Sequence, residues 1–289
     1  MRLAKKILKW SVIGLGTLFT AAFILIHQFT LYPTEKRLAK QFKDKGFEAP
    51  ALKLSPTSEG IITLIDNERQ SSLPTIVFIH GSPGSSQDFR LYFQDSSLVH
   101  YRLVSINRIG FAKENYQNIV LDLNKQARAY VEVIDQLEPK VDSVIWVGHS
   151  YGGAPAAIST LLSEKSSGLV LAAAPISPKD EPKFWFNRVA DNRLIYQLLP
   201  PLLKMAQKEK MSHADELQKV EEQFSSITQP IVLLQGDEDF MSPMKNVDYA
   251  EKTFTNSDSL LTKRITGQSH FFPFQGREHV VSAIKSFTP

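Results

Sequence analysis

Short apolar runs rich in β-branched residues recur along the chain and constrain its fold more than any other feature. Several of them are apolar without alternation, which is typical of strands covered on both faces. A sheet of such strands buries both faces only when helices pack on each of them. The runs are IITLI (61–65), TIVFI (75–79), YRLVSI (101–106), SVIWV (143–147), GLVLAAA (168–174), PIVLL (230–234) and SLLTKRI (259–265).

Helical patterns lie between these runs. Apolar residues recur at three- and four-residue steps in 121–138, and the segments 151–165, 243–254 and 276–287 have similar lengths. Alternating strands and helices predict an α/β fold with a mostly parallel sheet and helices on both faces. In such sheets, binding sites gather at the carboxyl ends of the strands.

One long segment, between Pro175 and Thr228, interrupts this alternation. It contains no convincing strand and reads as helices, NRLIYQLLPPLLKMAQ and then SHADELQKVEEQF. An ordinary pair of surface helices is one interpretation. Because long insertions in compact domains often serve as lids, we favour a helical cap over a pocket, at about 176–228. Its many aromatic and leucine side chains predict that the apolar part of a substrate lies against it.

The N-terminus combines basic and apolar residues. Four cations in MRLAKKILK precede an uncharged stretch from Trp10 to Thr34, which is long enough to span a bilayer. Because no A-x-A-like cleavage site follows, we predict a transmembrane anchor in 1–34 rather than a cleaved signal peptide or a buried helix. Basic residues flank both sides of this stretch, so the distribution of positive charge does not settle its orientation in the membrane. The short basic tail favours a cytoplasmic N-terminus with the folded body on the extracytoplasmic side. A cytoplasmic body and a cleaved, secreted form are the alternatives.

The segment after the anchor, 35–59, is charged and then rich in proline and small polar residues. We expect a short helix stopped by Gly46, followed by a linker, EAPALKLSPTSEG. The folded body is therefore predicted to begin near Gly60 and to extend over 60–289.

Charge and cysteine content exclude several kinds of function. Residues 47–289 carry 24 Lys/Arg against 28 Asp/Glu, so basicity is confined to the N-terminal end and no nucleic-acid surface is indicated. The absence of cysteine excludes thiol catalysis and thiolate metal sites. No metal or cofactor is implied.

The segment WVGHSYGGA (146–154) places Ser150 in a G-x-S-x-G pattern. The pattern also arises by chance, but here it follows an apolar run and precedes a helical one, as a strand–turn–helix nucleophile requires. Pro155 fits the first turn of that helix, where a missing N–H costs little. We therefore predict that Ser150 is a nucleophile.

A serine nucleophile needs a base oriented by an acid, and both should follow it in the order Ser, acid, His. His270 comes directly after the last strand run, whereas His279 lies in a helical run, so we favour His270 as the base. For the acid, spacing alone does not rank the candidates: Asp237, Glu238 and Asp239 after PIVLL, and Asp180 after GLVLAAA.

Backbone N–H groups should stabilise the oxyanion of an acyl-transfer intermediate. The residue after the nucleophile, Tyr151, would supply one of them. The loop HGSPGSSQDF follows the strand TIVFI, and its glycines allow an exposed N–H at Ser82.

Four segments, in this order, resemble the α/β-hydrolase superfamily, close to its esterase, lipase and proline-iminopeptidase-like branch: HGSPGSSQDF (80–89), VGHSYGGAPA (147–156), LQGDEDFMSP (234–243) and GQSHFFPF (267–274). The resemblance covers about 60–289 and implies the α/β-hydrolase fold with the 175–228 insertion as a cap. It also implies Ser150 as nucleophile, His270 as base, Asp239 rather than Asp237 as acid, and Ser82 and Tyr151 as oxyanion donors.

Two departures from the family pattern stand out. The stretch SINRIGFAKEN (105–115) lacks the usual second glycine and serine, which puts the shape of that loop in doubt. Ser82 replaces the glycine of proline-iminopeptidase-like enzymes, which weakens an aminopeptidase assignment. A serine nucleophile argues against haloalkane dehalogenase and epoxide hydrolase chemistry, which in this superfamily use aspartate.

These observations together predict a membrane-anchored serine hydrolase that cleaves a carboxylic ester with an apolar acyl group. An amidase, an aminopeptidase or a carbon–carbon bond hydrolase would use the same groups. A noncatalytic ligand-binding protein of the same fold is the alternative from another class, because a fold does not dictate a function.

Overall fold

The computed structural model describes residues 10, 11, 14, 16–18, 20, 22 and 34–288. Among these residues, no helix is both long and apolar enough to cross a membrane. The anchor predicted for 1–34 lies mostly outside them and stays a prediction.

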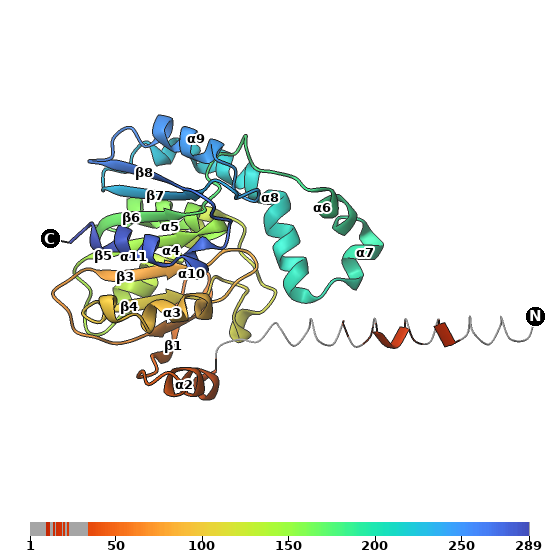
Figure 1. Cartoon of the computed structure of the whole chain (residues 1–289), viewed down its shortest axis with the longest axis horizontal. Helices are drawn as coiled ribbons and strands as arrows, with labels where there is room; N and C mark the ends of the chain where they lie inside the picture. Colours follow the sequence, from red (N-terminus) through yellow and green to blue (C-terminus); the bar gives the residue numbers. More distant parts are fainter. Residues whose placement is uncertain are drawn as a thin grey trace, which may run out of the picture.

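Eight strands form a single sheet in the order β1-β2-β4-β3-β5-β6-β7-β8 (Figure 1). β2 pairs antiparallel with β1 and β4, whereas all other neighbours are parallel. The predicted mostly parallel sheet is therefore confirmed. The strands are β1 (Ala51–Thr57), β2 (Gly60–Asp66), β3 (Thr75–Ile79), β4 (Leu103–Ile106), β5 (Val144–His149), β6 (Ser166–Ala172), β7 (Ile231–Gly236) and β8 (Leu260–Ile265).

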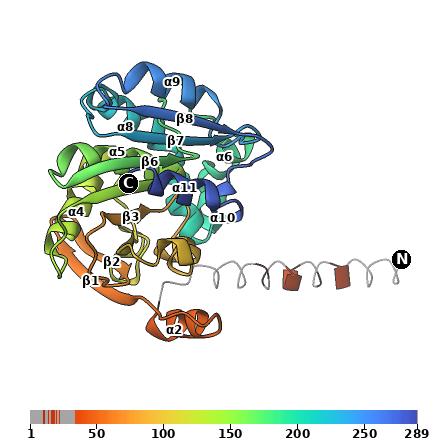
Figure 2. The same cartoon turned by 60° about the vertical axis from the view of Figure 1, so that its left-hand side comes forward.

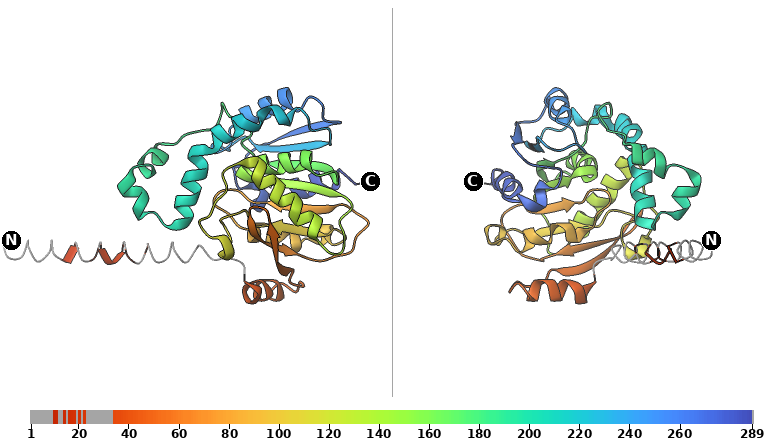
Figure 3. Two further views of the ribbon diagram at one scale, coloured as in Figure 1. Left: turned by 180° about the vertical axis from the view of Figure 1, so that it is seen from behind. Right: turned by 45° about the vertical axis from the view of Figure 1, so that its right-hand side comes forward.

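Helices cover both faces of the sheet, with α4 and α5 on one face and α3 and α11 on the other (Figures 1 and 3). Because side chains alternate along a strand, Val77 and Trp146 join the core under α4 and α5, whereas Phe78 and Val147 join the core under α11. The helices outside the cap are α2 (Glu35–Lys43), α3 (Arg90–Phe93), α4 (Leu123–Gln136), α5 (Gly153–Leu162), α9 (Lys245–Thr253), α10 (Phe272–Gln275) and α11 (Glu278–Lys285).

Strand β1 corrects the sequence analysis, which placed these residues in a linker. Proline and polar residues read as a loop, but β1 is the edge of the sheet and pairs only with β2. Proline has no N–H to donate to a neighbouring strand. At the edge of a sheet, where β1 has a neighbour on one side only, Pro56 is tolerated. Ser55 is its one buried residue, so the strand carries little of the apolar signal on which the prediction relied.

Helix α2 confirms the predicted charged helix and packs against the folded body. Thr34 caps it, its side chain accepting a hydrogen bond from the Arg37 N–H. Leu38 and Phe42 are buried against Ile65 of β2, and α2 lies beside β1 at one end of the sheet (Figure 2). The folded body therefore begins at α2 rather than near Gly60.

The chain between β6 and β7 forms the helices α6 (Trp185–Ala190), α7 (Arg193–Leu198) and α8 (Pro201–Phe224) and contains no strand. α6 and α7 project away from the sheet, whereas α8 returns to it (Figures 1 and 3). The C-terminal half of α8 joins the core through Leu217, Val220 and Phe224. The sequence suggested one helix through Pro200 and Pro201 and a second one after it, but the chain breaks at the two prolines, and the residues from Pro201 to Phe224 form the single helix α8. Pro201 occupies its first turn, where a missing N–H breaks no hydrogen bond.

Candidate active site

Ser150 lies at a sharp turn between β5 and a short 3-10 turn, Ser150–Gly152. Its φ of 52° falls in the left-handed region, which side-chain-bearing residues rarely adopt. Glycines make the turn possible, because there is no room for a side chain at two positions. A Cβ on Gly152 would lie 2.3 Å from the Ile79 carbonyl oxygen, and a Cβ on Gly148 would lie 2.6 Å from the Gly152 carbonyl oxygen. Strand, turn and helix are thus arranged as the motif requires.

His270 follows β8 and lies against this turn. Its Nε2 is 2.9 Å from Ser150 Oγ, and the side chain is buried. His279 lies on α11, with its nearest acidic partner Glu278 at 4.0 Å. The structure thus brings His270, and not His279, to Ser150.

Asp239 lies behind His270, in the loop after β7. Its Oδ2 is 2.8 Å from His270 Nδ1 and also accepts a hydrogen bond from the Gln235 side chain. Its Oδ1 accepts the backbone N–H groups of Met241 and Ser242, both at 2.9 Å. Four donors therefore hold this carboxylate in one orientation.

The other candidate acids lie elsewhere. Asp237 and Glu238 are exposed, and Asp237 accepts the Gly267 N–H instead. Asp180 accepts a hydrogen bond from the Ser177 hydroxyl and faces Lys245. Of the four acids that the sequence left open, Asp239 is the one that contacts His270.

The loop after β3 holds the predicted oxyanion donor Ser82. His80 Nε2 accepts the Arg108 backbone N–H at 2.9 Å, so the proton of the neutral ring is on Nδ1, which donates to the Gly81 carbonyl at 2.8 Å. Burial, followed by the nearby Arg108 charge, holds the pKa of His80 well below its ordinary value. Because the N–H and C=O of a trans peptide point in opposite directions, fixing the Gly81 carbonyl also fixes the Ser82 N–H.

The second predicted donor, the Tyr151 N–H, belongs to the first turn of a helical segment, where N–H groups have no intrahelical partner. The Tyr151 side chain is buried. Its ring stacks on the His213 ring of α8, with centroids 4.6 Å apart. The residue after Ser150 is thereby packed against the cap.

An ion pair that the sequence did not reveal joins the cap to this region. The Arg108 guanidinium binds both carboxylate oxygens of Glu209 on α8, at 2.7 and 2.8 Å, and both side chains are buried. The Arg108 guanidinium lies between the Phe111 and Tyr151 rings, and its Nη2 donates a hydrogen bond to the Gly81 carbonyl oxygen at 3.3 Å. Burial opposes its charge, but Glu209 outweighs burial and raises the pKa of Arg108.

The loop that contains Arg108 lacks the family's second glycine, and its backbone does not require one. Gly110, with φ at 92°, approaches Ile119 so closely that a Cβ would lie 2.5 Å from that side chain. Ala112, where the family has its second glycine, is extended with φ at −107°, a conformation open to any residue. The missing glycine is therefore not needed here.

His149, next to Ser150, points away from the Ser150 hydroxyl. Its Nε2 lies 3.2 Å from the His270 carbonyl oxygen. Burial, followed by the proximity of His270, lowers the pKa of His149 to about 3. His149 therefore stays neutral and leaves the contact between Ser150 and His270 undisturbed.

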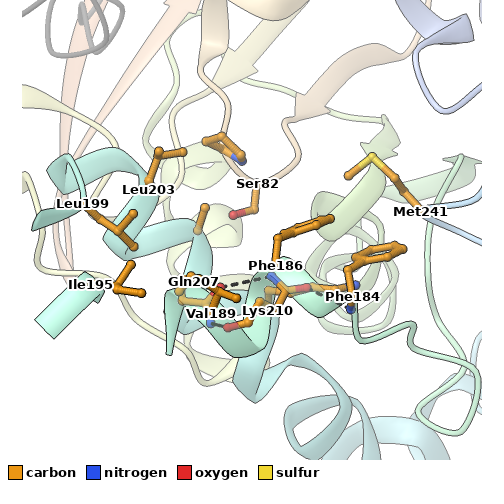
Figure 4. Close-up of a pocket in the computed structure, with 14 residues that line it drawn as sticks. Ser82, Phe184, Phe186, Val189, Ile195, Leu199, Leu203, Gln207, Lys210 and Met241 are labelled. Atoms are coloured by element: carbon orange, nitrogen blue, oxygen red, sulfur yellow. Dashed lines mark hydrogen bonds between the residues drawn. The ribbon is translucent and has the colours of Figure 1, made fainter. Parts of the chain in front are cut away.

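Two cavities meet at Ser82, Pro83 and Met241. One, of about 440 Å³, contains Ser150 and His270. The other, of about 420 Å³, lies within the cap and is mostly apolar (Figure 4). Its cap residues include Phe184, Phe186, Val189, Ile195, Leu199 and Leu203. The hydroxyl of Ser150 is thus next to an apolar compartment.

Comparisons with solved structures show the same fold. Est816, an N-acyl homoserine lactone degrading enzyme, is 16% identical with a TM-score of 0.61, over 82% of this chain and 100% of that one. A serine hydrolase from Cycloclasticus zankles is 12% identical, with a TM-score of 0.63, over 82% and 97%. The haloalkane dehalogenase DatA from Agrobacterium tumefaciens C58 is 16% identical, with a TM-score of 0.62, over 85% and 99%.

No curated protein sequence matches the chain significantly. A family model described as "Alpha/beta hydrolase family" matches residues 76–274, which include Ser82, Ser150, Asp239 and His270. The match spans more than half of the chain, and the strand order and the turn at Ser150 agree with it. The chain belongs to the alpha/beta hydrolase family.

Proposed function

We propose that this hydrolase cleaves a carboxylic ester with an apolar acyl group through an acyl-enzyme intermediate on Ser150. The proposal rests on one observation, the continuous contact of Ser150 Oγ with His270 Nε2 and of His270 Nδ1 with Asp239 Oδ2, at 2.9 and 2.8 Å. A serine hydroxyl is a poor nucleophile unless a base accepts its proton and a third group orients that base.

In the first half-reaction, Ser150 Oγ attacks the ester carbonyl carbon while His270 Nε2 accepts the hydroxyl proton. Asp239 holds the proton on Nδ1 and stabilises the imidazolium that forms. The N–H groups of Ser82 and Tyr151 stabilise the oxyanion, and losing one such donor costs about 3 kcal/mol. His270 then gives its proton to the departing alcohol, and the acyl group stays on Ser150.

In the second half-reaction, a water molecule takes the place of the alcohol. His270 accepts a proton from the water as its oxygen attacks the acyl carbonyl carbon. The bond to Ser150 Oγ breaks, Oγ recovers the proton from His270, and the carboxylic acid leaves. His149 is given no part in either half-reaction, because its Nε2 lies against the His270 carbonyl oxygen and Ser150 Oγ contacts His270 instead.

The apolar acyl group is proposed on the basis of the cap cavity. This cavity adjoins Ser82, so an acyl chain whose carbonyl lies at Ser150 can extend between the cap helices. Each methylene buried there contributes about 0.8 kcal/mol. An amide or a carbon–carbon bond as the scissile group is the alternative that the same three side chains allow.

The proposed location is a membrane, with the hydrolase body on the extracytoplasmic side. The sequence supports it through the apolar stretch Trp10–Leu31, which follows four cations. A cytoplasmic body and a secreted, cleaved form are the alternatives.

A fluorophosphonate probe tests the nucleophile directly. We expect wild type to be labelled and Ser150→Ala to be unlabelled, whereas Ser163→Ala, which alters another buried serine, is labelled like wild type. p-Nitrophenyl esters of increasing acyl length should be hydrolysed faster until the cavity is full, and aminoacyl arylamides slowly. Turnover of the arylamides alone would overturn the ester assignment, and an unlabelled, inactive wild type would favour the noncatalytic binding protein.

A further inference from the structure

Helices α6 and α7 expose large apolar side chains instead of burying them. Trp185 is 76% exposed, Leu194 77% and Leu198 64%, and Val189 is also exposed. α7 buries none of its residues, and α6 buries only Asn187. We call the surface formed by Trp185, Val189, Leu194 and Leu198 the cap face. Trp185 and Val189 lie one turn apart on α6, and Leu194 and Leu198 one turn apart on α7. Large apolar side chains exposed together on neighbouring helices are typical of a site of interaction with a partner or a membrane.

Basic residues surround the cap face. Residues 183–208 carry five Lys/Arg and one Asp/Glu, a net charge of +4, whereas the rest of 47–289 has a net charge of −8. Lys183, Arg188 and Arg193 are exposed beside the apolar side chains. Helices with aromatic and leucine residues next to Lys and Arg lie at the surface of anionic bilayers. Two copies of this face would repel each other, which disfavours a dimer through it.

The cap cavity opens at the same surface. Phe186, Val189 and Ile195 line the cavity and are at the same time partly exposed. In Figure 4, cap residues such as Val189 and Ile195 lie on one side of the cavity and Ser82 on another. The cap cavity therefore adjoins the cap face on one side and, at Ser82, Pro83 and Met241, the cavity that contains Ser150.

The membrane anchor proposed for the N-terminal segment would place lipid near the folded body, and the docking argued here rests on that part of the proposed function. The apolar stretch Trp10–Leu31 ends three residues before Thr34, where the described body begins. A body tethered so closely keeps its surface within reach of a bilayer. We propose that the cap face docks on an anionic lipid bilayer, with the mouth of the cap cavity at the membrane surface. The docking does not depend on the proposed ester cleavage.

The absence of cysteine from the chain allows a site-specific test in the full-length protein. Leu194→Cys places a single thiol on the cap face, and Leu261→Cys places one on β8, where Leu261 is also exposed. Each variant is labelled with an environment-sensitive fluorophore and reconstituted into vesicles of phosphatidylcholine, with or without phosphatidylglycerol. Both keep Ser150, so fluorophosphonate labelling checks the fold, and a Ser150→Ala background shows whether docking is independent of the reaction.

We expect the probe at position 194 to shift to the blue and to be quenched by nitroxide lipids in vesicles that contain phosphatidylglycerol, and the probe at 261 to do neither. High salt should reverse the shift. The double variant Arg188→Gln/Arg193→Gln should lower the equilibrium constant for docking on the anionic vesicles by roughly 10-fold or more, because each cation near an anionic surface strengthens binding several-fold.

Four results would overturn the proposal. One is equal quenching at 194 and 261. A second is the same shift in neutral and anionic vesicles, and a third is a shift that is insensitive to the loss of both arginines. The fourth is a probe at 194 that is already shielded from aqueous quenchers in neutral vesicles, which would mean that a second copy or the N-terminal segment covers the face.

Discussion

Ser150 adopts a backbone conformation that is unfavourable for a residue with a side chain. A conformation of this kind costs about 1–3 kcal/mol and persists only where the surroundings impose it. Here the surroundings are Gly148 and Gly152, which let β5 and the following turn approach the Ile79 carbonyl. The strain therefore serves to present one hydroxyl to His270.

Asp239→Asn tests the role of the carboxylate. An amide NH₂ in place of Oδ2 would face His270 Nδ1 and favour the tautomer that carries its proton on Nε2, which cannot accept the Ser150 proton. We expect kcat for an ester to fall by about 10,000-fold with the fold retained. Ester kinetics and circular dichroism measure the two effects, and Asp237→Asn, which alters an exposed neighbour, serves as the control. A small loss in Asp239→Asn would remove Asp239 from the mechanism.

Asp88, which lines the cavity around Ser150, gives a pH-dependent prediction. Burial raises the pKa of Asp88 from 3.8 to about 6, although Ser85 donates hydrogen bonds that oppose the shift. Between these two pKa values, Asp88 keeps its proton in the folded protein but has lost it in the unfolded chain. The contribution of Asp88 to the free energy of unfolding therefore falls as the pH rises from about 4 to 6. Asp88→Asn removes this contribution, and its stability relative to wild type should therefore improve with rising pH.

Urea unfolding on both sides of this range measures the effect. Asp95→Asn is the matched control, because hydrogen bonds from Ser97 and Arg277 outweigh burial and lower the pKa of Asp95. The stabilisation from Asp95 is present above the ordinary pKa and is lost as the pH falls. The two variants should thus diverge from wild type in opposite directions; parallel behaviour would contradict the raised pKa of Asp88.

At the scale of residues, the sequence predicted Ser150 and His270 as partners because each follows a strand in the family order. Spacing alone left Asp237, Glu238, Asp239 and Asp180 open, since it does not show which carboxylate turns inward, and only the family resemblance named Asp239. The ion pair between Arg108 and Glu209 gave no signal, because its partners are 101 residues apart and Glu209 reads as one charge in a polar helix.

Among the elements, α8 connects the cap to the loops around Ser150. Its N-terminal part lines the cap cavity, its middle contacts Arg108 and Tyr151, and its C-terminal part joins the sheet core. A displacement of α8 would therefore reach the Gly81 carbonyl through Arg108.

Glu209→Gln tests this connection. Removing one partner of a buried pair leaves an uncompensated charge, so we expect a loss of about 3–5 kcal/mol in unfolding free energy. kcat should also fall, because Arg108 also holds the Gly81 carbonyl. Lys208→Gln on the same helix, which removes an exposed cation, is the control and should leave both unchanged.

The double variant Arg108→Met/Glu209→Leu separates packing from positioning. An apolar replacement of both partners should restore most of the stability. It should not restore kcat, since the contact with the Gly81 carbonyl is still missing. Recovery of both quantities together would show that the pair is only structural.

The elements were predicted to the extent that their apolar pattern was regular. Seven strands and the helices α4, α5, α9 and α11 follow from that pattern, whereas the short α3 was not predicted. β1 was missed because an edge strand needs few apolar residues and tolerates Pro56. The helix α2 was expected, but its packing was not, since two apolar residues in a charged helix do not reveal a partner.

For the molecule as a whole, the proposed anchor in 1–34 and the proposed docking of the cap face are two separate contacts with lipid. The fragment 34–289 retains Thr34, which caps α2. We expect it to keep ester activity and to leave membranes in high salt, because only the basic cap face would then hold it. The full chain should resist salt and alkaline washing. Salt-sensitive binding of the full chain would argue against an anchor in 1–34.

The buried Arg108–Glu209 pair also limits how this protein can be recombined with its relatives. Glu209 belongs to the insertion and Arg108 to the scaffold. A chimera that receives a foreign insertion between β6 and β7 would inherit the arginine without its acid unless the donor carries a carboxylate at the matching turn of its helix. Grafting for new specificity would therefore have to transfer residues 107–111 together with the insertion.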